Sequence, residues 1–311
     1  MTLGIQHSSV AVFAPSPILT VTVENGPDGG EVHFHPGGQG FWVARMAASL
    51  GARVSLCVPL GGESGDVLRA LLDAEGIEVL AVRTGGANAA YLHDRRSGER
   101  QPIVETQSPG LGRHELDELY GVALTAGLDS GAMLLTGPRH GHVLPAETYT
   151  RLAGDLRANG RPVLADLTGE PLRAALRGGL DLLKLSLEEL HAEGLASGAG
   201  LADLDAPIRQ LGREGAECVL VSRGPDPALA LVGGRLLEVS GPRFAAIDPR
   251  GAGDSMFAAL GVGVAAGLEL EEAMRLGVAA GALNVTRHGL GSGHVKEIDR
   301  LLGQVRIRDA V

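Results

Sequence analysis

Strand-like and helix-like segments alternate along most of this chain of 311 residues. A helical pattern at 41–50 ends at Gly51, and strand-like segments follow at 54–60, 77–82, 132–136, 162–167, 180–185 and 218–222. Such alternation implies right-handed crossovers and a mostly parallel sheet that carries helices on both faces. The sequence therefore predicts an α/β fold built on a doubly wound sheet.

Local signals set some of the boundaries within this pattern. Asp66 is a favourable cap for a helix over 67–75, and Gly76 is a favourable stop after it. Further along the chain, Gly233-Gly234 separates two apolar runs at 228–232 and 235–239. Two glycines between such runs predict a β-hairpin.

Two segments interrupt the alternation of strands and helices. Apolar and polar residues alternate at about 18–36, and again at about 86–108 around the turn Ser97-Gly98. Half-buried strands of this kind suit a small open sheet that projects from the main layer. Because open α/β sheets bind ligands at the carboxyl ends of their strands, we expect the small sheet to be a lid over such a site. Without a linker or a repeat, residues 1–311 read as a single domain with a lid.

The composition argues against several functional classes. The net charge is −10 and no long basic run is present, so we expect no nucleic acid partner. The longest apolar runs are too short and too rich in glycine to span a membrane, and the N-terminus lacks the pattern of a signal peptide. Cys57 and Cys218 lie in apolar segments and predict reduced thiols in the core. We therefore expect a cytoplasmic protein with no membrane partner.

The motif richest in chemical information is a glycine-rich loop that leads into an apolar helix. It runs from Asp248 through Gly251-Ala252-Gly253 to Asp254, and an apolar stretch follows at 256–266. A helix start presents unpaired N–H groups and the positive end of the helix dipole, and small residues let a phosphate approach them. A carboxylate at the same place accepts a proton from an attacking hydroxyl group. The loop therefore fits phosphoryl transfer to an alcohol.

The same loop also has a simpler interpretation. Aspartate is favoured at helix N-caps, so Asp254 would then only cap the helix, and the glycines would only form a tight connection. An isolated Gly-x-Gly-Asp pattern does not decide between the two interpretations, and the rest of the chain has to.

Four other segments accompany this loop. They are Pro36-Gly37-Gly38-Gln39-Gly40-Phe41-Trp42-Val43-Ala44-Arg45, Leu60-Gly61-Gly62-Glu63-Ser64-Gly65-Asp66, Lys184-Leu185-Ser186-Leu187-Glu188-Glu189-Leu190 and Ser222-Arg223-Gly224. Together with the loop, and in this order, they resemble the PfkB/ribokinase family of sugar kinases over nearly the whole chain. The form Val43-Ala44-Arg45 is most similar to the branch of 1-phosphofructokinase and tagatose-6-phosphate kinase. The resemblance implies a ribokinase-like fold and a phosphotransferase that uses ATP and Mg²⁺ on a small sugar or sugar phosphate.

This resemblance implies a role for each residue of the loop. Asp254 would be the base that takes the proton of the sugar hydroxyl. The N–H groups of Gly251, Ala252 and Gly253 would stabilise the charge on the transferring phosphoryl group.

The resemblance also implies residues that bind the nucleotide and metal ions. Lys184 and Ser186 would lie near the ATP phosphates, and Glu189 would hold Mg²⁺ through water. Asp248 would contribute to a monovalent-cation site like that of ribokinase relatives. The residues expected to line the nucleotide pocket are Ser222, Gly224, Asn284 and Gly289.

The acceptor side departs from the family pattern. The family has an Asp that binds sugar hydroxyls where this chain has Thr20, and it has an Asn where this chain has Trp42. Beside Gly38, the family has a Lys that helps bind a substrate phosphate, and this chain has Gln39. Arg139 follows the strand at 132–136 and is a candidate to restore the lost charge. Trp42 either fills part of the sugar pocket or packs in the core.

Two hypotheses follow from a donor side that mostly matches the family pattern and an acceptor side that departs from it. The first is an active kinase whose acceptor is not the usual phosphosugar, and the presence of Asp254 favours it. The second is a catalytically weak or silent family member that binds a nucleotide or a sugar metabolite as a regulator. The exposed edge strands of the lid predict a homodimer formed through it.

Overall fold

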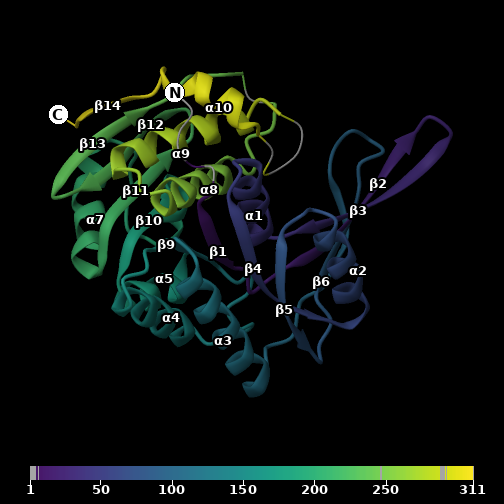
Figure 1. The fold of residues 1–311 in the computed structure, drawn as a ribbon. Helices are drawn as coiled ribbons and strands as arrows, with labels where there is room; N and C mark the ends of the chain where they lie inside the picture. The colour runs from purple at the N-terminus through teal and green to yellow at the C-terminus, as the bar shows by residue number, and fades with distance from the viewer. Residues whose placement is uncertain (1–4, 6, 246, 288–290, 292, 311) are drawn as a thin grey trace.

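The computed structural model describes residues 5, 7–245, 247–287, 291 and 293–310. Within them, a ten-stranded sheet carries helices on both faces (Figure 1). The expected doubly wound α/β fold is confirmed. From one edge to the other, the strands are β14 (Arg306–Asp309), β13 (Arg235–Ser240), β12 (Asp226–Val232), β11 (Ala216–Arg223), β10 (Leu180–Ser186), β9 (Val163–Asp166), β8 (Ala132–Thr136), β1 (Ser9–Phe13), β4 (Arg53–Gly61) and β5 (Glu78–Thr84).

The strands from β11 to β5 are parallel, and β12, β13 and β14 continue the sheet in antiparallel fashion. The hairpin predicted at Gly233-Gly234 joins β12 to β13, where Val232 pairs with Arg235. The carboxyl ends of the parallel strands consequently lie along one edge of the sheet, where open α/β folds place their ligands.

Helices bury both faces of the sheet. Successive side chains of a strand point to opposite faces, so Val10 and Val12 of β1 pack into one core and Ala11 and Phe13 into the other. The first core includes α1 (Gln39–Ser49), α2 (Gly62–Asp73), α8 (Ala252–Ala265), α9 (Leu270–Asn284) and α10 (Val295–Leu302). The second includes α3 (Arg113–Asp129), α4 (Glu147–Ala158), α5 (Gly169–Gly178), α6 (Leu187–Ala192) and α7 (Leu201–Glu214).

A second sheet of four strands projects from the body of the molecule (Figure 1). Its strands, in spatial order, are β3 (Gly29–Gly37), β2 (Ile18–Gly26), β6 (Ala89–Asp94) and β7 (Gln101–Glu105). They come from the two segments in which apolar and polar residues alternate. One face of this sheet carries Thr20, Thr22 and His35 toward a cavity, and the other carries Val32 and Phe34. We call this sheet the lid.

One helix boundary predicted from the sequence is wrong. The helix that was expected to begin after Asp66 begins at Gly62, so Asp66 lies inside α2 rather than at its cap. Asn88 explains the earlier start, because its Oδ1 accepts from the Gly61 N–H group at 2.9 Å and its carbonyl oxygen accepts from Ser64 Oγ at 2.8 Å. A contact from a distant segment thus outweighs the local capping signal. Cys57 and Cys218 are buried and free, as predicted.

Candidate active site

Charged side chains gather at the carboxyl ends of the parallel strands. Asp166 is the last residue of β9, and Lys184 lies beside it in register on β10. The Nζ atom of Lys184 donates to Asp166 Oδ2 at 2.8 Å, and the two side chains are only 4 % and 2 % exposed. Because burial of a charged pair carries a large desolvation cost, this arrangement points to a functional site.

The glycine-rich loop forms the start of α8. Gly251 precedes the helix with φ of 75°, a left-handed conformation that other residues rarely adopt. Asn284 of α9 holds the loop: its Nδ2 donates to the Arg250 carbonyl oxygen at 2.8 Å, and its Oδ1 accepts from Ser255 Oγ at 3.0 Å. Among the described residues, the N–H group of Gly253 has no acceptor. The helix start is therefore a fixed and open position for an anion.

Asp254 is not the cap of this helix. The N-cap residue is Gly251, and Asp254 lies within the first turn of α8. The simpler interpretation of the loop, in which Asp254 serves only as a cap, is therefore wrong.

Two cavities meet at the first turn of α8. One has a volume of about 330 Å³ and is lined by Ala252 and Gly253 together with residues of α9 and of the loops after β11 and β13. The other has a volume of about 780 Å³, lies against the lid, and is lined by Gly251 and Asp254. The first turn of α8 is the wall that they share, so groups bound in the two cavities would approach each other there.

Asp254 and its charged neighbours influence one another strongly. Burial raises the pKa of Asp254 to about 7, with a further contribution from Asp166, while Lys184 acts in the opposite direction. Burial lowers the pKa of Lys184, but Asp166, Glu189 and Asp254 outweigh it, so the net pKa is raised and the ammonium group stays charged. Three carboxyl groups surround one ammonium group. This imbalance favours an additional cation at the site.

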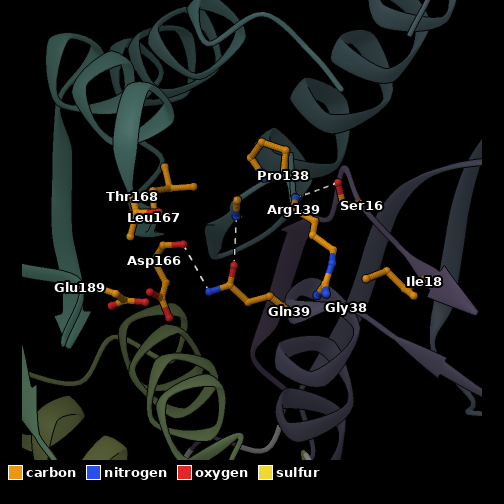
Figure 2. Close-up of a pocket in the computed structure, with 11 residues that line it drawn as sticks. Ser16, Ile18, Gly38, Gln39, Pro138, Arg139, Asp166, Leu167, Thr168 and Glu189 are labelled. Carbon is orange, nitrogen blue, oxygen red and sulfur yellow. Dashed lines mark hydrogen bonds between the residues drawn. The ribbon is translucent and has the colours of Figure 1, made fainter. Parts of the chain in front are cut away.

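A smaller pocket of about 200 Å³ joins this charged cluster to the lid side (Figure 2). Asp166 and Glu189 face one end of it, and Arg139 and Ile18 lie at the other. Gln39 stands between them: its Nε2 donates to the Asp166 carbonyl oxygen at 3.4 Å and its Oε1 accepts from the Gly137 N–H group at 3.0 Å. Both ends of the Gln39 amide are thus already bonded to the backbone.

The predicted acceptor residues lie together beside the large cavity. Thr20, Gly38, Gln39, Trp42 and Arg139 all line it. Trp42 also packs on Phe41 with ring centroids 4.7 Å apart, so its indole combines core packing with exposure to the cavity. The Nε atom of Arg139 donates to Glu105 Oε1 of β7 at 2.6 Å. In this structure Arg139 therefore links the body of the protein to the lid.

The predicted nucleotide and metal residues fall into three groups. Ser222 and Gly224 line the 330 Å³ cavity. Ser186 and Glu189 form a capping box at the start of α6, in which Glu189 Oε2 accepts from the Ser186 N–H group at 2.7 Å. Asn284 does not line the cavity, because its amide supports the loop as described above. Gly289 lies outside the described residues.

Asp248, which was expected to bind a monovalent cation, accepts from Arg250 at both carboxylate oxygens, from Nε at 2.8 Å and from Nη2 at 2.5 Å. Its role toward a cation stays a prediction.

Several residues of the site were not identified from the sequence. Asp166 is the most important, and the available signal was an acid at the carboxyl end of a predicted strand. Ile18 lines both the 200 Å³ pocket and the large cavity. Tyr91 and Arg100 of the lid also line the large cavity, as does Arg250 of the loop before α8. The fold of the lid brings the first two there, whereas Arg250 lies within the motif from Asp248 to Asp254 but was given no role.

The chain is similar to known carbohydrate kinases over most of its length. The model of the pfkB family carbohydrate kinase matches residues 11–297. The ATP-dependent 6-phosphofructokinase isozyme 2 of Escherichia coli (strain K12) is 32 % identical over 262 residues, which cover 82 % of this chain and 83 % of that protein. The 1-phosphofructokinase of Bacillus subtilis (strain 168) is 26 % identical over 278 residues, which cover 88 % of each chain.

Solved structures give the same result. The crystal structure of phosphofructokinase-2 from Escherichia coli in complex with potassium matches with a TM-score of 0.82 and 27 % identity, and covers 95 % of this chain and 98 % of that one. Arabidopsis thaliana ribokinase, with ribose and ATP, matches at 20 % identity with a TM-score of 0.75 over 96 % of this chain and 99 % of its own, and shares the fold.

The fold is ribokinase-like, and the relatives show a phosphotransferase with an alcohol group as acceptor. The chain belongs to the pfkB family of carbohydrate kinases. No helix within the described ranges is long and apolar enough to cross a membrane.

Proposed function

We propose that this chain transfers the γ-phosphoryl group of ATP to a hydroxyl group of a sugar or sugar phosphate. The observation that carries the proposal is the position of the first turn of α8 between two cavities. Ala252 and Gly253 face the more apolar cavity, which suits a nucleotide, whereas Asp254 faces the cavity under the lid, which suits the acceptor. Ser222 and Gly224 would contact the nucleotide from the far side of the first cavity.

Asp254 is the proposed base of the reaction. As the acceptor oxygen bonds to the γ-phosphorus, its proton passes to the Asp254 carboxylate, the bond from the γ-phosphorus to the bridging oxygen breaks, and ADP leaves. A pKa of about 7 suits a group that must accept a proton near neutral pH. The N–H groups of Gly251 and Gly253 stabilise the charge that develops on the phosphoryl oxygens. The third N–H group expected from the sequence, that of Ala252, donates to the Pro249 carbonyl oxygen at 3.4 Å in this structure.

Lys184 reinforces this anion site. A Cβ atom at Gly253 would lie 2.9 Å from Lys184 Nζ, so the ammonium group reaches the helix start at that glycine. Its charge would act on the same phosphoryl oxygens as the N–H groups do.

The acidic pocket fits Mg²⁺. Asp166 Oδ1 is buried and has no hydrogen-bond partner in the described part of the chain, and Glu189 faces the same pocket. No cluster of three or more His, Cys, Asp or Glu side chains suited to a metal occurs among the described residues. Two carboxylates suffice for Mg²⁺, because this ion keeps several waters and binds substrate phosphates. When bound by Asp166 and Glu189, it would neutralise charge on the ATP phosphates.

The test of the proposed function is ADP formation from Mg²⁺-ATP with a panel of sugars, sugar phosphates and nucleosides. We expect at least one acceptor to be phosphorylated, and Asp254→Asn to lower kcat by about 10²- to 10⁴-fold, as loss of a general base does. Asp117→Asn, which changes an exposed acid on α3, is the matched control and is expected to keep wild-type activity.

Two results would count against parts of this proposal. Near wild-type activity of Asp254→Asn would remove Asp254 as the base. If nothing on the panel is phosphorylated while ATP still raises the melting temperature, the second hypothesis, a regulator that binds nucleotide, gains over the kinase.

We also propose that two copies of the chain pair through their lids. The face of the lid that points away from the cavity exposes Val32 by 55 %, Phe34 by 50 % and Val104 by 49 %. Helix α2 contacts β2 and β3 of the lid, so part of the lid is held against the body and the apolar outer part is left open. An open apolar sheet face with an edge strand favours association with a second, identical face.

A further inference from the structure

The cavity under the lid contains more positive charge than the rest of this acidic chain would suggest. Its lining includes the side chains of Arg45, Arg95, Arg100, Arg139 and Arg250. Most of these arginines have an acidic partner. Arg139 binds Glu105, Arg95 lies 3.3 Å from Glu24, Arg250 binds Asp248, and Arg45 lies 3.3 Å from Glu75.

Arg100 is different from these four. It lies in the connection between β6 and β7 of the lid, and its guanidinium lies 5.8 Å from the centroid of the Tyr91 ring. Among the described residues, no carboxylate forms an ion pair with it. Burial lowers the pKa of Arg100, and the positive charge of Arg250 lowers it further. Arg100 and Arg250 thus line the same cavity, where each disfavours the positive charge of the other.

Arg250 is the second member of this pair. It directly precedes Gly251, and its carbonyl oxygen accepts from Asn284 Nδ2, so its backbone belongs to the fixed loop at the start of α8. Its side chain is 48 % exposed and binds Asp248 through Nε and Nη2. A guanidinium has five N–H donors, so donors remain free for a ligand.

Among the described residues that line the cavity, no other arginine is without an acidic partner. Gln39 is neutral and both ends of its amide bind the backbone, while Arg139 is bound to Glu105. Two guanidinium groups, one from the lid and one from the loop at the start of α8, thus line one cavity, and Asp248, the ion-pair partner of Arg250, lines it with them. An anion between them would relieve their repulsion and would accept charge-assisted hydrogen bonds from both.

We propose that Arg100 and Arg250 bind an anionic group of the acceptor, a phosphate monoester or a carboxylate, while its hydroxyl group faces Asp254. This inference rests on the proposed kinase function and adds the class of acceptor and the residues that select it. The cavity volume of about 780 Å³ leaves room for a sugar-sized molecule that spans from the loop to the lid. Because Arg100 belongs to the lid, binding of the anion would also hold the lid over the acceptor.

The test uses the full chain with saturating Mg²⁺-ATP and two matched pairs of acceptors. Fructose 6-phosphate and gluconate carry the two anions, and fructose and sorbitol are their neutral counterparts. Arg100→Met keeps an apolar stem against Tyr91 and removes the charge. Arg96→Met is the control, because Arg96 lies in the same connection but pairs with Asp94 and does not line the cavity.

We expect the wild type to prefer one anionic acceptor over its neutral counterpart. Arg100→Met should raise the KM for that acceptor by about 10- to 100-fold, the range for loss of a charge-assisted hydrogen bond, and leave the KM for ATP and for the neutral counterpart unchanged. Arg96→Met should behave as the wild type. The preferred anion, phosphate or carboxylate, then identifies the acceptor class. A preference for neutral acceptors, or an unchanged KM in Arg100→Met, would overturn the inference.

A binding measurement separates this inference from the kinase function. Calorimetric titration of the protein without ATP, with fructose 6-phosphate and with gluconate, needs no turnover. Binding that Arg100→Met weakens by about 10-fold or more, in a protein that phosphorylates nothing, supports the anion site and counts against the kinase. If the protein phosphorylates an acceptor and Arg100→Met leaves the KM for that acceptor unchanged, the kinase function is supported and the anion site is overturned. Absence of binding by both anions also overturns it.

Discussion

Three carboxyl groups and one ammonium group lie together in the site. Asp166 and Lys184 are buried, whereas Asp254 and Glu189 are partly exposed. Burial disfavours ionisation of Asp254, the charges of Asp166 and Glu189 disfavour it further, and Lys184 favours it. The pKa of Asp254 therefore rises to about 7, whereas Lys184 stays protonated. The result is a base that gains and loses its proton near neutral pH, held beside a group with a permanent positive charge.

The raised pKa of Asp254 predicts a cost in stability. The unfolded carboxyl has a pKa of 3.8 and the folded one about 7, so the folded state binds this proton more tightly. Stability is then lost as pH rises from about 4 to about 7, and the full penalty applies above that range. Asp254→Asn removes the charge. At pH 8 we expect the free energy of unfolding of this variant to exceed that of the wild type by about 2 to 4 kcal/mol. The difference between the two proteins should shrink to zero as the pH falls toward 4.

Urea unfolding at pH 8, 6 and 4 measures this difference, and Asp117→Asn is again the control, because its side chain is 63 % exposed. If Asp254→Asn is no more stable than the wild type at pH 8, the carboxyl is not strained by its surroundings. In the active protein, kcat/KM should fall as pH drops below about 7, since this ratio reports the pKa of the free enzyme.

The limits of sequence reasoning at this scale are visible in two acids. Asp254 was identified because its neighbours in the sequence, residues 251–253, form a recognisable glycine-rich motif for binding a phosphate. Asp166 was not, because its meaning comes from Lys184 on the adjacent strand, 18 residues further along. An ion pair between two adjacent strands cannot be recognised from a local sequence motif.

At the scale of elements, the start of α8 has to form a stable helix and also leave room for Lys184 at Gly253. A helix gains stability when glycine is replaced by alanine, by about 0.5 to 1 kcal/mol. Gly253 has ordinary helical geometry, so nothing in its backbone requires glycine. Its Cβ position is instead taken up by Lys184 Nζ, at 2.9 Å. Glycine here keeps the approach between the helix start and Lys184 open.

Gly253→Ala should therefore separate activity from stability. We expect the melting temperature to stay unchanged or rise slightly, while kcat falls by about 10²-fold because Lys184 and the N–H groups no longer act on the same oxygens. Steady-state kinetics and a thermal melt measure the two quantities. A matched control is Gly121→Ala on α3, where a new Cβ meets nothing within 4 Å. Full activity of Gly253→Ala would mean that Lys184 does not approach the phosphoryl group.

Elements whose pattern is local were predicted well, and those fixed by distant contacts were not. Alternation of polar and apolar residues indicated the lid strands, and Gly233-Gly234 indicated the hairpin of β12 and β13. The start of α2 was wrong because Asn88, beyond the next strand, binds Gly61 and Ser64. Arg100 was missed for the same reason, since only the fold of the lid brings it to the cavity that Arg250 also lines.

At the scale of the whole molecule, the two faces of the lid differ in character. The face toward the cavity carries polar and charged groups such as Thr20, Glu24 and Glu105, and Glu105 binds Arg139 of the body. The other face carries Val32, Phe34 and Val104. The difference implies that the lid has two partners, a ligand and the body on one side, and a second apolar surface on the other. The proposed acceptor site and the proposed dimer would then share one sheet.

This arrangement predicts that pairing of the chains supports acceptor binding. Phe34→Glu puts a charge on the open apolar face, where it disfavours burial against a second copy. We expect light scattering to give a mass near twice 32.0 kDa for the wild type and near 32.0 kDa for the variant. Because a lid without its partner is held less firmly, the KM for the acceptor should rise by about 10-fold with little change in the KM for ATP. Val67→Glu, at a 38 % exposed position on α2, is the control and should stay dimeric. A wild type that is monomeric at micromolar concentration, or a Phe34→Glu variant that remains dimeric, would show that the apolar face of the lid has another role.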